Sequence, residues 1–159
     1  MEYRFRKYRK IIGIPALWRN FEMAILGKTD VNDWDFKKTW YHGSPLELAA
    51  IREGSTITQN VNLARAFSHK PTFVTINVSD ENINIKHNGQ IEGFLYRIEE
   101  ELSSDDIYSH PDSCMEFGFE WLTKRELHIT LIGDAEILDG EMLSEEEVAE
   151  LKKHCEKNG

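Results

Sequence analysis

Trp-Tyr-His-Gly-Ser-Pro, residues 40–45, is the stretch that decides the fold of this chain. Its two aromatic residues favour a β-strand, and Gly43 tolerates backbone angles that are closed to other residues. Ser44 suits a helix N-cap, and proline suits the first helical position. The pattern therefore predicts a strand, a tight turn and a helix over 45–53. His42 is placed at the strand end, beside the backbone N–H groups of Gly43 and Ser44, where it can hold a flat polar ligand.

The rest of the chain alternates between strand-like and helix-like segments. A helix capped by Asn60 or Asn62 is predicted, and a final helix begins at the capping box of Ser144 and Glu147. Turn-forming residues predict an irregular excursion over 79–90, and an acidic loop is expected over 99–111. Strands are predicted over 55–59, 72–78, 93–98, 120–122 and 127–132. Strands dominate the middle and helices lie near the ends, which is typical of an α+β fold.

The first 38 residues differ from the rest in charge and pattern. Residues 1–19 carry six Arg and Lys residues against the single acid Glu2, and a helix is predicted from Pro15. A polar connector over 28–38 separates this helix from the remainder of the chain. We therefore divide the chain into a basic helical extension, 1–38, and a domain, 39–159. The basic extension is a candidate contact for an anionic partner.

Composition excludes several classes of protein. With 159 residues and 40% hydrophobic content, the chain is long and apolar enough to bury a core, and its net charge of −9 argues against general nucleic-acid binding. No apolar run is long enough for a membrane span. Two cysteines without a CxxC pair are typical of the cytoplasm. The six histidines show no metal-binding spacing, so no metal is expected.

The order of motifs resembles the ADP-ribosyltransferase fold, a split antiparallel β core with flanking helices. The resemblance is strongest to the small bacterial rifamycin-type ADP-ribosyltransferases, and it covers roughly residues 40–132. It depends on short motifs: Tyr-His-Gly-Ser at 41–44, Ile-Thr-Gln at 57–59, Gly-Phe-Leu-Tyr-Arg-Ile at 93–98, Asp-Asp at 105–106 and Thr-Lys-Arg-Glu-Leu-His-Ile at 123–129.

The resemblance implies that NAD is a substrate and assigns roles to individual residues. His42 would bond the adenosine ribose of NAD, and Gly43 would offer its backbone to the nicotinamide carboxamide. Glu120 and Asp106 compete as the catalytic carboxylate, and we favour Glu120. The residue two positions before it is Gly118 rather than the usual Gln or Glu, which disfavours transfer to arginine.

The chemistry needs a fixed negative charge. Cleavage of the nicotinamide–ribose bond passes through an oxocarbenium-like state, and a carboxylate beside the sugar stabilises the developing positive charge. The family usually also stacks a tyrosine on the nicotinamide, at a position that aligns with Thr56 here. A hydroxyl cannot replace an aromatic face, so another ring must supply it: Tyr96, Tyr108, Phe67 or Phe73.

The expected function is therefore an NAD-dependent ADP-ribosyltransferase acting on a protein, nucleic acid or small molecule. One alternative is a catalytically silent module on the same fold. Another is an RNA 2′-phosphotransferase-like enzyme, which needs arginines near the phosphate; the candidates are Arg52, Arg65, Arg97 and Arg125.

Overall fold

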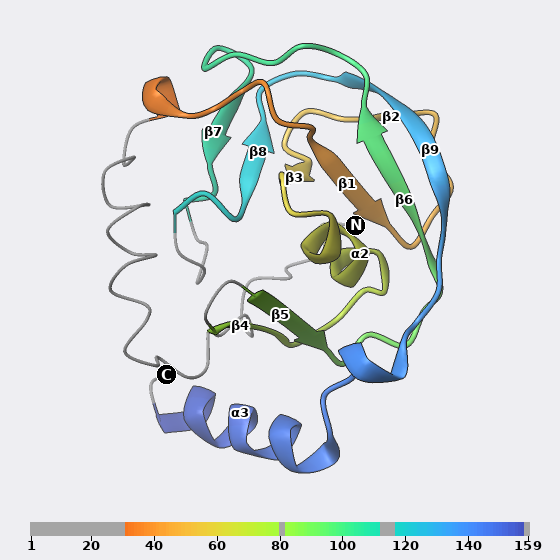
Figure 1. The fold of residues 1–159 in the computed structure, drawn as a ribbon, viewed down its shortest axis with the longest axis vertical. Coiled ribbons are helices and arrows are strands. Elements are labelled where there is room, and N and C mark those ends of the chain that lie inside the picture. The colour runs from red at the N-terminus through yellow and green to blue at the C-terminus, as the bar shows by residue number, and fades with distance from the viewer. Residues whose placement is uncertain (1–30, 80–81, 112–116, 158–159) are drawn as a thin grey trace.

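A computed structural model describes residues 31–79, 82–111 and 117–157 (Figure 1). The helix predicted from Pro15 and the basic segment before it lie outside these residues. The strands are β1 (Tyr41–Ser44), β2 (Ala50–Ile51), β3 (Thr56–Ile57), β4 (Val74–Ser79), β5 (Asn82–His87), β6 (Gly93–Ile98), β7 (Ile107–Ser109), β8 (Trp121–Thr123) and β9 (Leu127–Ala135). The helices are the 3₁₀ turns η1 (Val31–Asp33) and η2 (Asp139–Glu141) and the α-helices α2 (Val61–Ser68) and α3 (Glu145–Lys157).

The strands form three small antiparallel sheets. Their orders are β1-β6-β9-β2, β3-β8-β7 and β4-β5. A single antiparallel bridge between Tyr41 and Thr58 connects the first sheet to the second. The hairpin β4-β5 lies between α2 and α3 (Figure 1). The described chain is thus a mixed fold of two α-helices and mostly antiparallel strands, as the α+β prediction required.

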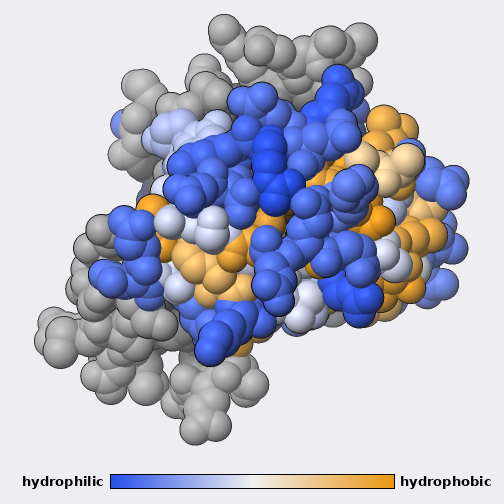
Figure 2. Space-filling model, turned by 90° about the horizontal axis from the view of Figure 1, so that it is seen from above, coloured by the Kyte–Doolittle hydropathy of each residue, from blue (hydrophilic) through white to orange (hydrophobic). Residues whose placement is uncertain are grey.

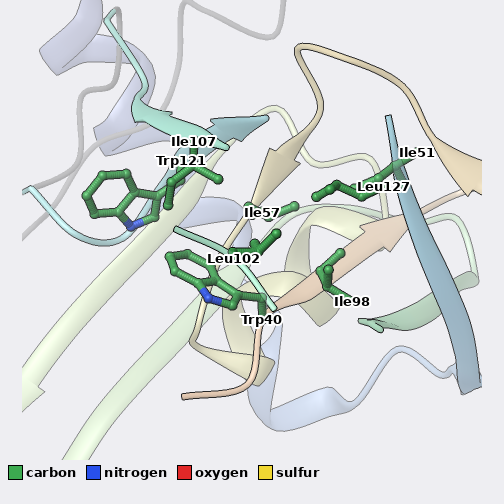
Figure 3. Close-up of a cluster of buried hydrophobic side chains, with 8 residues drawn as sticks. All are labelled: Trp40, Ile51, Ile57, Ile98, Leu102, Ile107, Trp121 and Leu127. Atoms are coloured by element: carbon green, nitrogen blue, oxygen red, sulfur yellow. The ribbon is translucent and has the colours of Figure 1, made fainter. Parts of the chain in front are cut away.

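The main core lies between the first two sheets. Trp40 and Trp121 form an edge-to-face pair with ring centroids 6.1 Å apart, and Ile51 and Leu127 close the other end (Figure 3). A second core, with Leu63 and Ala66 at its centre, lies between α2 and the β4-β5 hairpin. Burying these side chains is the dominant favourable term in folding, and it fixes the strands that carry the candidate site.

Several local predictions are confirmed. The Asn60 side chain caps α2 by accepting from the amides of Asn62 and Leu63. At α3, the Ser144 amide donates to Glu147 at 2.8 Å and the Glu147 amide donates to the Ser144 hydroxyl at 3.1 Å, which is the predicted capping box. The strand over 93–98 has the predicted bounds.

Three predictions are wrong. The loop expected over 99–111 contains the strand β7 (Ile107–Ser109). The helix over 45–53 does not form; instead, Ala50–Ile51 is the strand β2. The Ser44 hydroxyl accepts from the Leu46 amide in a short turn, and burial of Ile51 in the main core outweighs the local helix signals. The excursion over 79–90 contains strand β5, whose alternating Ile83, Ile85 and His87 are directed toward the interior.

The described end of the predicted connector packs against the core. Trp34 lies with its ring centroid 5.2 Å from that of Trp121 and donates its indole N–H to Gln59 at 3.0 Å.

Hydrophilic side chains cover the middle of the surface seen from above, and hydrophobic ones gather toward the right (Figure 2). No helix in the described ranges is long and apolar enough to cross a membrane.

Candidate functional site

The ring of His42 is fixed on β1 by one hydrogen bond. Its Nδ1 lies 2.7 Å from the carbonyl oxygen of Thr56 on β3. A carbonyl only accepts, so Nδ1 carries the proton and Nε2 has the free lone pair. Burial lowers the pKa of His42 below its ordinary value of 6.5, although the bond to Thr56 opposes this shift. The imidazole is therefore neutral at neutral pH, and its Nε2 is able to accept a hydrogen bond.

The backbone of Gly43 points to the edge of β1 opposite β6. Hydrogen bonding alternates along an antiparallel strand, and Ile98 donates to the Trp40 carbonyl on the β6 side. The polar backbone groups of Tyr41 and Gly43 therefore face the other edge. There, Tyr41 exchanges hydrogen bonds of 2.7 and 3.0 Å with Thr58.

That edge is open beside Gly43. The next carbonyl of β3 in the ladder belongs to Thr56, and the His42 ring occupies it. Within the described residues, nothing is bonded to the N–H or the C=O of Gly43 on this edge. One donor and one acceptor thus lie together on the backbone, which is the pattern that binds a primary carboxamide.

Gly43 also has a packing role. A Cβ atom at this position would lie 1.8 Å from the carbonyl oxygen of Ala64 in α2. Any side chain would therefore push α2 away from β1. The glycine is needed for the close approach of helix and strand, whatever ligand the strand edge binds.

Glu120 lies on the same face of the strand ladder as Gly43. Its side chain is only 2% exposed, and it directly precedes β8. Ile57 pairs with Trp121, which aligns Thr58 with Glu120, and Thr58 in turn pairs with Tyr41. Lateral neighbours share a face of a sheet, and residues two apart on a strand do so as well.

His42 lies on the opposite face. Because side chains alternate along β1, the side chain of His42 lies on the same face of the strand ladder as Ile57 and Trp121. Its ring nevertheless reaches the β3-side edge of β1, because Nδ1 bonds the Thr56 carbonyl there, beside the backbone groups of Gly43.

Asp106 lies apart from Glu120 in an ion-pair network. Ile107 pairs with Thr123 and Ser109 pairs with Trp121, so the two acids lie at opposite ends of the β7-β8 pair. Arg125 donates to Asp106 at 2.8 Å, and the Ser103 amide donates to it at 2.8 Å. Burial raises the pKa of Asp106, but these hydrogen bonds outweigh it and the net shift is downward from 3.8.

The remaining predicted residues have structural contacts. Ser44 is buried, and its hydroxyl is occupied by the Leu46 amide. Thr56 contributes its carbonyl to His42. Tyr96 is 1% exposed, so its face is not open to a nicotinamide ring. It is the cross-strand partner of His42, with centroids 6.4 Å apart, and its hydroxyl accepts from the Leu48 amide at 2.7 Å.

The arginines considered for phosphate binding are mostly occupied. Arg65 pairs with Glu141, Arg97 with Glu99 at 2.9 Å, and Arg125 with Glu100 and Asp106. The ion pairs of these three arginines lie on different elements, and none of the three ion pairs includes His42. The phosphotransferase alternative gains no support from this arrangement.

The sequence analysis missed a second polar cluster, made of His69, His87 and Glu141. The residues are too far apart in the chain for any spacing motif to link them. Burial and, to a smaller extent, the neighbouring His69 lower the pKa of His87 to about 4, although Glu141 opposes the shift.

Comparisons with family models, curated proteins and solved structures found no match for this chain.

Proposed function

We propose that this chain is an NAD-dependent ADP-ribosyltransferase in which β1 holds the dinucleotide and Glu120 is the catalytic acid. The proposal assigns the ADP-ribosyltransferase fold to residues 39–159, and the mixed, mainly antiparallel architecture is compatible with it. NAD is the substrate, and an acceptor of unspecified chemistry receives the ADP-ribose.

The open edge at Gly43 is the observation that carries the proposal. Nicotinamide ends in a primary carboxamide, whose NH₂ donates and whose oxygen accepts. The C=O and N–H of Gly43 supply the matching acceptor and donor on one strand edge. Two such bonds fix the orientation of the ring because both must form at once.

His42 positions the other half of the molecule. Its neutral Nε2 accepts a hydrogen bond, and the ribose hydroxyls of NAD donate one. The bond from Nδ1 to Thr56 fixes the tautomer and the ring orientation. Since the His42 ring and the Gly43 backbone both reach the β3-side edge of β1, one dinucleotide can contact both there.

Glu120 supplies a fixed negative charge from a buried position, level with Thr58 and Tyr41 across the strands, and it acts through its field because it is only 2% exposed. As the nicotinamide–ribose bond breaks, positive charge develops on the ribose, and a buried carboxylate stabilises it more strongly than a solvated one. The nicotinamide leaves as a neutral molecule with the bonding electron pair, and the acceptor then attacks the ribose carbon and releases its proton to solvent. Asp106 is less suited because Arg125 neutralises it.

A second candidate function is NAD binding without transfer. Thr56, in the position of the stacking tyrosine, offers no aromatic face, and the ring of Tyr96 is buried. The open edge of Gly43 would then serve only to bind the carboxamide. This module would bind NAD with the same residues and leave the glycosidic bond intact.

Two measurements on the full chain separate these functions. Calorimetry measures NAD binding, and chromatography measures nicotinamide release, with and without a cell lysate as a source of acceptors. We expect wild type to bind NAD and release nicotinamide. We expect Glu120→Gln to bind NAD without releasing it and Asp106→Asn to retain activity, with folding of each variant checked by circular dichroism.

The other outcomes are equally informative. Binding without release under both conditions identifies the silent module. Loss of release in Asp106→Asn alone moves the catalytic role from Glu120 to Asp106. Absence of NAD binding by folded wild type contradicts both functions.

A further inference from the structure

Three residues from separate elements meet beside the β4-β5 hairpin. His69 directly follows α2 as its C-cap, His87 ends β5, and Glu141 ends η2. A parallel bridge between His87 and Met142, with the Leu143 amide donating to the His87 carbonyl at 2.9 Å, fixes η2 beside β5. The fold thus holds these side chains together through backbone contacts.

Each residue directs a buried polar atom into the cluster. His69 and His87 are both 0% exposed, and one donor atom from each of the three residues lies within 4.8 Å of the other two. Within the described part of the chain, no hydrogen-bond partner is found for Nε2 of His69, Nε2 of His87 or Oε2 of Glu141. A buried polar atom without a partner is costly, so three together indicate a shared ligand.

The imidazole of His69 is already oriented as a metal ligand. Its Nδ1 donates to the Ile91 carbonyl at 2.8 Å, which leaves the lone pair on Nε2. Metal-bound histidines usually donate their other ring nitrogen to a carbonyl or carboxylate in this way. Gly89 holds the backbone tightly here, because a Cβ atom would lie 2.5 Å from the His69 carbonyl oxygen.

At His87 and at Glu141, existing interactions oppose metal binding and must be changed or tolerated. The Gly89 amide donates to Nδ1 of His87 at 3.1 Å, so Nε2 of His87 bears the proton in the neutral ring. A cation must displace that proton or move it to Nδ1. Arg65 pairs with Oε1 of Glu141 and brings a positive charge close to the cluster. That pair also orients Glu141 and leaves Oε2, which lies 3.9 Å from Nε2 of His87, for a further ligand.

We propose that His69, His87 and Glu141 bind a divalent transition-metal ion, with Zn²⁺ best matched to two imidazoles and one carboxylate. A tetrahedral ion with bonds of about 2 Å holds its ligand atoms roughly 3.3 Å apart, so the donor atoms need to approach by ~1.5 Å at most. Water completes the coordination. The ion joins α2, the β4-β5 hairpin and the segment leading into α3, and it acts independently of the proposed transferase.

The test uses the full chain without a histidine tag. Protein treated with a chelator and dialysed is titrated with ZnCl₂, and binding is measured by calorimetry and by thermal unfolding. We expect one Zn²⁺ per chain and, at about a hundred times Kd, a rise in unfolding midpoint of roughly 5 to 10 °C. Co²⁺ in place of Zn²⁺ should give the absorption bands of a four-coordinate site.

Variants identify the ligands. Glu141→Gln keeps the shape of a partly exposed side chain and should weaken Zn²⁺ binding at least ~10-fold; His69→Gln should abolish it. His128→Gln is the matched control, because His128 is 80% exposed on β9 and lies outside the cluster. If His69→Gln does not fold, Glu141→Gln decides alone. Zn²⁺ binding that is undetectable in wild type, or unchanged in Glu141→Gln, overturns the proposal.

Discussion

The edge of β1 and the His69–His87–Glu141 cluster both place histidines beside unbonded polar atoms, but they are built differently. At the β1 edge, His42 and Gly43 are adjacent in sequence, and the open atoms belong mainly to the backbone. In the cluster, the three residues come from a helix end, a strand end and a 3₁₀ turn, and the open atoms belong to side chains. The first suits a polar organic ligand and the second suits a cation. The two regions should therefore respond to different ligands and different substitutions.

Glu120→Gln should give the largest effect, on the transferase side alone. Removing the fixed charge should lower the rate of nicotinamide release about 100- to 1000-fold, as loss of one stabilising group does in other enzymes. NAD and Zn²⁺ affinities should change little. Single-turnover measurement of nicotinamide release, beside Zn²⁺ titration, checks this; a parallel loss of Zn²⁺ binding would mean that the regions are coupled.

Gly43→Ala tests how far the β1 edge depends on packing. The new methyl group meets the Ala64 carbonyl oxygen at 1.8 Å, so we expect the free energy of unfolding to fall by at least ~2 kcal/mol. Gly133→Ala is the control, since nothing lies within 4 Å of a Cβ there. Urea unfolding of both variants measures the difference. Equal stabilities would show that α2 does not press on β1 as described.

His42→Ala and Glu141→Gln form a reciprocal pair. His42→Ala removes one hydrogen bond and should weaken NAD binding about tenfold, equivalent to ~1.4 kcal/mol, with no change in Zn²⁺ affinity. Glu141→Gln should do the reverse. Calorimetric titrations of both variants with both ligands test the independence of the regions. A variant that weakens both ligands equally would contradict it.

Asp106→Asn should give the smallest effect and should depend on pH. The folded pKa of Asp106 is below 3.8, so its ionised form stabilises the fold above pH 3.8, and that contribution is lost as pH falls through the folded value. We expect a loss of about 1 kcal/mol or less at neutral pH. Denaturant curves of wild type and Asp106→Asn, measured at pH 7 and below pH 3.8, should give a stability difference that shrinks in acid. A difference that grows in acid would contradict the assignment of a lowered pKa to Asp106.

The amino-acid sequence predicted those features of the fold that depend only on residues close together in the chain. The Asn60 cap, the Ser144–Glu147 capping box and the strand over 93–98 need only local chemistry, and each appears in the structure. The helix predicted after Ser44 fails because Ile51 contributes more in the core than in a surface helix. The open edge of Gly43 requires knowing where β3 stops pairing, which no local pattern states.

The cluster shows the same limit more strongly. His69 and His87 are ordinary histidines in sequence, 18 positions apart, and Glu141 lies in an acidic stretch. Packing of α2 against β5 and docking of η2 beside β5 make them neighbours. Spacing motifs detect ligands that share one helix or one turn, so a site assembled by tertiary packing has no such motif.

The most direct measurement is an NMR titration of a ¹⁵N-labelled sample with NAD, in which the chemical shift of the Gly43 amide is followed. Binding of the carboxamide at the β1 edge predicts that this resonance, together with the His42 ring, shifts in a saturable manner while His69 and His87 do not. Saturable NAD binding that leaves Gly43 and His42 unshifted would contradict the account.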